Sequence, residues 1–311
     1  MRPAPRWVLL IAGAGYAFLH LPVLVLVVFS FNASRYSVSW TGFTLDWYRA
    51  LAGRADLWRG LRASLIVGTL STVAAAGLGT LLALGIARGR FRGRRGIEGL
   101  LTLPLVTPEV VTGISLLLLF VLLGMPLGLT TITIAHIAFN IAFVAVVVRA
   151  RLAGMDRSLE EAALTLGADE LTAFRTVTLP ALRPGIAAGA LLAFIMSFDD
   201  YVITSLVAGP GSSTLPVVVY GMARRNVEPT INAISTIILL GTSLLLYAAH
   251  RVIARAEGPP VIARAEGPKQ SRWIATGPSG PRDDYRPSGP RDDYRPSGPR
   301  DDYRPSGLRD D

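Results

Sequence analysis

Six long apolar runs alternate with polar segments over residues 1–257. A helix needs roughly 20 apolar residues to cross the hydrocarbon core of a membrane, and each run reaches about that length. The alternation predicts an all-α, polytopic membrane protein with six transmembrane helices in one domain. The predicted spans are Trp7–Phe31, Ala63–Ala87, Leu103–Leu123, Thr131–Val148, Ile186–Ala208 and Ile231–His250.

Composition agrees with this class, because 51% of the residues are apolar and the mean hydropathy is +0.44. The sequence contains no cysteine, which excludes disulfides and thiolate metal sites. Before the tail, the predicted cytoplasmic segments carry 12 arginines and the outer loops carry seven, with a dense group at Arg88–Arg95. Positive loops stay in the cytoplasm, so this loop and both termini are predicted to be cytoplasmic, and the net charge of +9 needs no nucleic acid partner.

A polar segment, Glu161–Pro180, separates two of the predicted spans. Ser158, followed three residues later by Glu161, has the pattern of a capping box and predicts a helix start. Gly167 favours the left-handed conformation that ends many helices, and Asp169 can start a second short helix that runs to Pro180. A polar helix–turn–helix between membrane spans indicates a docking element for a soluble partner.

The last segment, residues 258–311, contains a repeated unit. The sequence SGPRDDYRP starts at Ser279, Ser288 and Ser297. Proline, glycine and alternating charges cannot bury enough apolar surface to fold, so a disordered C-terminal tail is predicted. Two interpretations stay open: an interaction tail, or a tandem duplication that a chain terminus tolerates. The absence of a core favours the second.

Three acidic residues lie inside the predicted spans, namely Glu109, Asp199 and Asp200. A charge at the centre of a spanning helix costs about 2.5–3.5 kcal/mol and usually faces a pathway or a partner. One interpretation is an acidic lining for a cationic substrate, and the other is pairing with a partner subunit or a position at interfacial depth. Adjacent helical residues diverge by about 100°, so at most one aspartate is expected to line a given pathway.

The polar segment resembles the EAA loop of binding-protein-dependent ABC importer permeases. The matching residues are Glu161, Ala162, Ala163, Gly167, Leu179 and Pro180. Val177 departs from the pattern, which usually has isoleucine there. The resemblance implies a type I permease fold, with a cytoplasmic coupling helix that docks on an ATPase subunit. The alternative for Glu161 is that it only closes its own capping box.

Further motifs resemble those of polyamine importer permeases, including the putrescine type. They are Ser197–Ile203, Gly209–Gly211, Thr214–Pro216 and Thr107–Val110. This resemblance implies a permease in the bacterial inner membrane that forms a translocation pathway for polyamines. It also implies an ATPase dimer, a second homologous permease and a periplasmic solute-binding protein as partners.

No catalytic or cofactor role is expected of this chain. The phosphate-loop pattern GxxxxGK[ST] does not occur in the sequence, so Mg-ATP is expected on the ATPase partner. Three alternatives remain: a permease for another small organic solute, an ion-coupled secondary transporter, and an intramembrane aspartyl protease. The protease is disfavoured because the side chains of Asp199 and Asp200 diverge and make a poor shared-proton pair.

Overall fold

The computed structural model describes residues 5–35, 39–89, 91–225 and 229–257, and the predicted repeat tail lies outside them. Over these ranges the chain is helical, with one isolated antiparallel bridge between Asn32 and Phe43. The elements are α1 Arg6–Phe29, α2 Asp46–Ala52, α3 Ala55–Arg88, α4 Arg94–Val106, α5 Glu109–Leu122, α6 Leu129–Ala153, α7 Ser158–Thr165, α8 Glu170–Ala173, the π-helical turn η1 Phe174–Thr178, α9 Leu179–Asp199, α10 Val202–Val207, α11 Leu215–Arg225 and α12 Pro229–Glu257.

Five helices of the described chain are long and apolar enough to cross a membrane: α1, α3, α6, α9 and α12. The pair α4 and α5 adds a sixth span when the two helices are taken together. The predicted all-α membrane fold is therefore confirmed. The third span differs from the prediction, because α4 and α5 meet at an angle of 112°.

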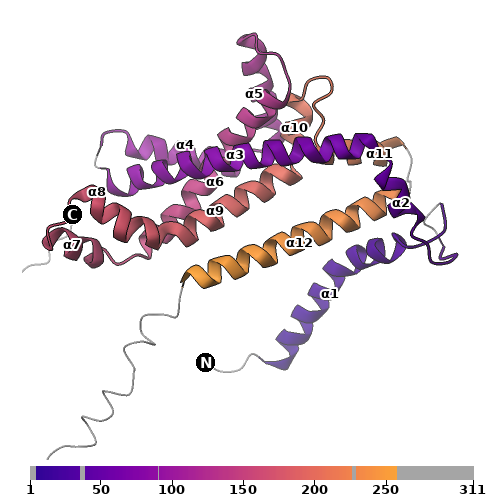
Figure 1. Cartoon of the computed structure of the whole chain (residues 1–311), viewed down its shortest axis with the longest axis horizontal. Helices are drawn as coiled ribbons and strands as arrows, with labels where there is room; N and C mark the ends of the chain where they lie inside the picture. The colour runs from indigo at the N-terminus through magenta and orange to yellow at the C-terminus, as the bar shows by residue number, and fades with distance from the viewer. Residues whose placement is uncertain (1–4, 36–38, 90, 226–228, 258–311) are drawn as a thin grey trace, which may run out of the picture. The chain divides into compact units, whose positions relative to one another are not determined.

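The centre of the bundle is formed by α3, α6 and α9, which lie side by side (Figure 1). Small residues let these helices approach closely, as is common in membrane bundles. A side chain at Gly79 of α3 would lie 2.8 Å from Cβ of Val144 in α6, a distance that real atoms do not adopt. Buried apolar residues fill the remaining space: Ala75, Ala83, Ile86, Ala145, Val148, Leu182 and Ala193.

Helix α1 is apolar all round and contributes almost nothing to this core. Its most apolar stretch is 0% buried, and its main helical neighbour is α12 (Figure 1). An isolated helix of this kind is stable only where lipid or another subunit covers its side chains. Its exposure agrees with a membrane environment.

The predicted third span, Leu103–Leu123, is wrong as a continuous helix because the chain breaks at Pro108. Proline has no N–H to donate to the carbonyl four residues earlier, and it drives the preceding residue out of helical geometry. Thr107 accordingly has φ −75° and ψ 131°, an extended conformation. Glu109 therefore begins α5 instead of lying inside a continuous helix.

The predicted fifth span, Ile186–Ala208, is also broken, since α9 ends at Asp199 and α10 begins at Val202. The prediction that a second short helix ends at Pro180 is also wrong, because here the helix continues where a break was expected. The chain stays helical through η1, Pro180 and Pro184 into α9. The wider turn of η1 precedes Pro180, where the regular hydrogen-bond register cannot continue.

Candidate coupling and translocation sites

Helix α7 begins differently from the predicted capping box. Its N-cap is Arg157, which makes no side-chain capping hydrogen bond, and Ser158 is already helical. The N–H of Ser158 donates instead to Oδ1 of Asp156 at 2.9 Å. Asp156 thus satisfies that amide from two residues upstream. The helix therefore starts at Ser158, one residue before the start predicted with Ser158 as N-cap, and Glu161 does not close a capping box.

The turn after α7 follows the predicted chemistry. Gly167 has φ +92°, a left-handed conformation that side chains disfavour. Asp169 then caps α8, accepting a 3.3 Å hydrogen bond from the N–H of Thr172. Hydrogen bonding from the Thr172 side chain, and then from its backbone N–H, holds the pKa of the Asp169 carboxyl below its ordinary value. Both residues thus fix the turn between α7 and α8.

The motif residues divide between an exposed helix and the first turn of a spanning helix. Glu161 and Ala162 are exposed on α7, and Leu166 just after it is 89% exposed. Leu179 and Pro180 are half-buried at the start of α9. The structure therefore connects an unpartnered surface of α7 to α9 through α8 and η1. Ala163 is half-buried, and Gly167 lies in the turn.

Glu109 lies at the proline break, on the first turn of α5, with an exposed side chain. A carboxylate is favoured there because the N-terminal end of a helix carries partial positive charge. A small cavity of about 30 Å³ adjoins Glu109. Hydroxyl and aromatic side chains contribute to its wall, among them Thr107, Thr112, Phe139 and Phe143.

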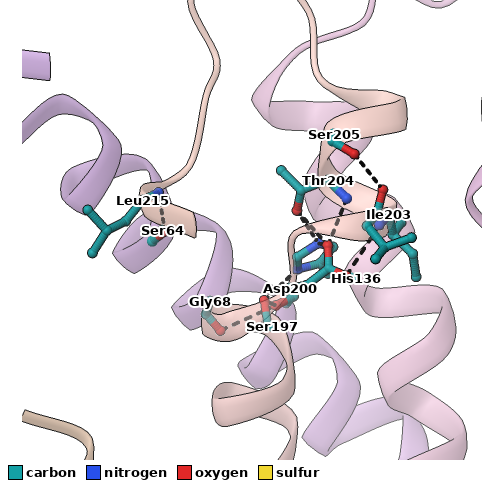
Figure 2. Close-up of polar contacts among 11 residues, drawn as sticks. Ser64, Gly68, His136, Ser197, Asp200, Ile203, Thr204, Ser205 and Leu215 are labelled. Atoms are coloured by element: carbon teal, nitrogen blue, oxygen red, sulfur yellow. Dashed lines mark hydrogen bonds and ion pairs between the residues drawn. The ribbon is translucent and has the colours of Figure 1, made fainter. Parts of the chain in front are cut away.

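The two neighbouring aspartates have opposite surroundings. Asp199 is exposed at the last residue of α9, whereas the side chain of Asp200 is only 5% exposed. Asp200 accepts hydrogen bonds at 2.7 Å from both the N–H and the hydroxyl of Thr204 (Figure 2). Its Oδ2 also lies 3.3 Å from Nε2 of His136 in α6. Asp200 thereby holds the start of α10 against α6.

His136 is the centre of this network, and sequence reasoning assigned it no role. It is fully buried, with Nδ1 2.6 Å from Oγ of Ser197 and Nε2 3.0 Å from Oγ1 of Thr204. Thr204 gives its single hydroxyl hydrogen to Asp200, so its oxygen accepts a hydrogen from Nε2 of His136. A histidine inside an apolar run was the signal that could have identified this site.

The network continues into α3. Oγ of Ser71 lies 3.0 Å from Oγ of Ser197, and the Ser71 hydroxyl donates to the carbonyl of Gly68 at 3.3 Å. Ser64, two turns earlier, accepts from the N–H of Leu215 at 2.9 Å and holds the start of α11. Polar side chains thus join α3, α6, α9 and α10 around the break at Asp200, which we call the aspartate break.

Comparison with known proteins identifies the family. Residues 75–257 match the family described as "Binding-protein-dependent transport system inner membrane component". The chain is 45% identical to the putrescine transport system permease protein PotI of Escherichia coli (strain K12) over 258 residues, 81% of this chain and 92% of PotI. It is 41% identical to the spermidine/putrescine permease PotC of the same strain over 240 residues, 77% of this chain and 90% of PotC.

Solved structures share the fold. A bacterial ABC transporter involved in alginate import covers 80% of this chain, with a TM-score of 0.66 and 16% identity. The MetNI methionine ABC transporter, in an inward-facing conformation, covers 64% of this chain, with a TM-score of 0.54 and 19% identity. The family match and the similar permeases argue against the alternatives of a secondary transporter and of an intramembrane protease. The chain belongs to the family of binding-protein-dependent transport system inner membrane components, as a permease subunit of an ABC importer.

Proposed function

We propose that this permease forms the translocation pathway for a polyamine, with putrescine as the main substrate. The observation that carries the proposal is the 45% identity to a putrescine permease over 92% of that protein. The identity to a spermidine/putrescine permease supports the same class of substrate. Both named solutes are organic cations at neutral pH, which suits a pathway lined by carboxylates.

Glu109 and Asp199 are the carboxylates proposed to line this pathway. Each lies at a helix end where a predicted span is interrupted, and each is exposed. Transporters commonly place substrate sites where helices are discontinuous. Asp200 is the less suitable member of the predicted set, because His136 and Thr204 already engage its carboxylate. We therefore assign Asp200 to holding the break and Asp199 to the cationic solute.

The proposed assembly contains an ATPase dimer, a second homologous permease and a periplasmic solute-binding protein. A relative of known structure was solved with its periplasmic protein, and the fold similarity supports a comparable arrangement. The exposed surface of α7, with Glu161 and Ala162, is proposed to dock on the ATPase subunit. Both termini and the α7–α8 segment are then cytoplasmic, in agreement with the arginine distribution.

Reconstitution tests the substrate. The chain, assembled in proteoliposomes with its second permease and ATPase, should import radiolabelled putrescine from loaded binding protein when ATP is supplied. Spermidine should be the second-best solute, and a neutral solute of similar length should not be imported. Import of the neutral solute at the rate of putrescine contradicts the polyamine assignment.

Cysteine labelling tests the orientation, because the natural chain contains no cysteine. A cysteine at the exposed Ser213 should react with an impermeant thiol reagent added from the periplasmic side. A cysteine at the exposed Thr172 should react only after the membrane is opened. The reverse pattern rules out both the orientation and the docking role of α7.

A further inference from the structure

Side chains from three elements meet at the end of α3. Nη2 of Arg88, the last residue of α3, lies 2.5 Å from Oε2 of Glu160 in α7. The hydroxyl of Thr178, the last residue of η1, donates to the same oxygen at 2.9 Å. Arg88 Nη2 also donates to the Thr178 oxygen at 3.2 Å. The three side chains close a triangle that joins α3, α7 and η1.

Two members of this triangle, Arg88 and Glu160, line an open cleft beside α7. The cleft has a volume of about 670 Å³ and lies between α7 and the ends of α3, α4 and α6. The backbone of α7 lies closest to α8 and η1. Its contact with α3 is made by side chains, through the ion pair between Glu160 and Arg88. Thr178 is fully buried, whereas the side chains of Arg88 and Glu160 are 39% and 26% exposed. The attachment therefore has one buried and two half-exposed members.

Both elements held by the triangle lead to the aspartate break. η1 continues directly into α9, which ends at Asp199. α3 is a single helix of 34 residues, and Ser71 lies about 26 Å along it from Arg88. Ser71 contacts Ser197 beside the break. A displacement of α7 can thus act on the centre of the bundle through α3 and α9.

We propose that Arg88, Glu160 and Thr178 form a latch that transmits the displacement of α7 to α3 and α9. The latch rests on the proposed docking of α7 on the ATPase subunit. Neighbouring residues of a helix diverge by about 100°, so the side chains of Glu160 and Glu161 leave α7 in different directions, although both residues border the cleft. Glu160 holds the helix to the bundle, and Glu161 is left exposed for the partner.

The test measures coupling separately from docking. Glu160→Gln and Arg88→Gln are made in the full chain, which is assembled with its second permease, the ATPase dimer and putrescine-loaded binding protein in proteoliposomes. The ATPase should still co-purify, while putrescine imported per ATP hydrolysed should fall about fivefold. The charge-exchanged variant Arg88→Glu with Glu160→Arg should restore most of this ratio. A role in folding alone would change the amount of complex and not the ratio.

Arg94→Gln is the matched control, because Arg94 pairs at 3.2 Å with Glu98 in its own helix. It should keep the parental ratio. A parental ratio in both latch variants, an equal loss in Arg94→Gln, or no recovery on charge exchange overturns the latch.

Two further variants, Glu161→Ala and Gly167→Leu, separate the latch from docking. If neither weakens ATPase co-purification, the docking proposal fails. If they weaken it while Glu160→Gln and Arg88→Gln couple normally, only the latch is wrong.

Discussion

Two of the predicted spans of this permease are interrupted, and the two interruptions are held by different means. At the proline break, Thr107 and Pro108 separate α4 from α5 through backbone chemistry alone. At the aspartate break, Asp200 and Tyr201 separate α9 from α10 without a proline, and Asp200 bonds to His136 and Thr204. The first break follows from its own residues, whereas the second needs α6 to supply a partner.

The difference separates structural from transport roles among the acidic residues. Both breaks place a carboxylate at an exposed helix end, Glu109 at one and Asp199 at the other. Only the aspartate break has an additional buried carboxylate, Asp200, and that group is engaged by its neighbours. We therefore expect the buried network to control stability and the exposed carboxylates to control uptake.

The largest effect is expected from His136→Ala, which removes the partner of a buried carboxylate. A buried carboxylate that loses a hydrogen-bonding partner costs about 3 kcal/mol in the free energy of unfolding. Urea unfolding of the full chain in detergent micelles measures this loss. His20→Ala is the control, because His20 is exposed on α1 and should change stability by less than about 0.5 kcal/mol. Equal values for the two variants would show that the network does not hold the break.

A smaller loss is expected from Thr204→Val, which keeps the shape of the side chain and removes its hydroxyl. Asp200 then loses one of its hydrogen bonds, and Nε2 of His136 loses a 3.0 Å acceptor. An unsatisfied buried group costs about 1–3 kcal/mol, so the unfolding free energy should fall within that range. Ser205→Ala is the control, since the Ser205 hydroxyl donates to the Val202 carbonyl and is exposed. Unchanged stability in Thr204→Val argues against a cooperative network.

The exposed carboxylates should affect transport and leave stability nearly unchanged. Asp199→Asn and Glu109→Gln each remove one attraction for a cationic solute while keeping the size of the side chain. Putrescine uptake should fall about tenfold in each, equivalent to roughly 1.4 kcal/mol. Initial uptake rates in proteoliposomes, at equal amounts of assembled complex, provide the measurement. Parental rates in both variants contradict an acidic pathway through the two breaks.

The smallest effect is expected from Pro108→Ala at the proline break. Alanine can adopt φ −55° and ψ 134°, the conformation of Pro108, so the change acts mainly by loosening the unfolded chain. Such a substitution costs about 0.4–1 kcal/mol in unfolding free energy, well below the loss expected for His136→Ala. Urea unfolding under the same conditions measures both. A larger loss in Pro108→Ala would reverse the contrast between the two breaks.

The sequence by itself determined the features that depend on local chemistry. Long apolar runs can bury their backbone hydrogen bonds only as helices in a membrane, so the spanning helices were predictable. Gly167 and Asp169 fixed the turn after α7, because left-handed geometry and helix capping require few neighbours. The motif from Glu161 to Pro180 identified the family for the same reason, since it is contiguous in the chain.

Tertiary structure decided which polar residues are engaged and which are exposed. Asp199 and Asp200 are neighbours with the same chemistry, and only the approach of His136 from α6 gives them different surroundings. Glu160 and Glu161 differ in the same way, because Arg88 of α3 and Thr178 of η1 reach only the former. These distinctions depend on contacts between residues far apart in the chain, and sequence periodicity does not record such contacts.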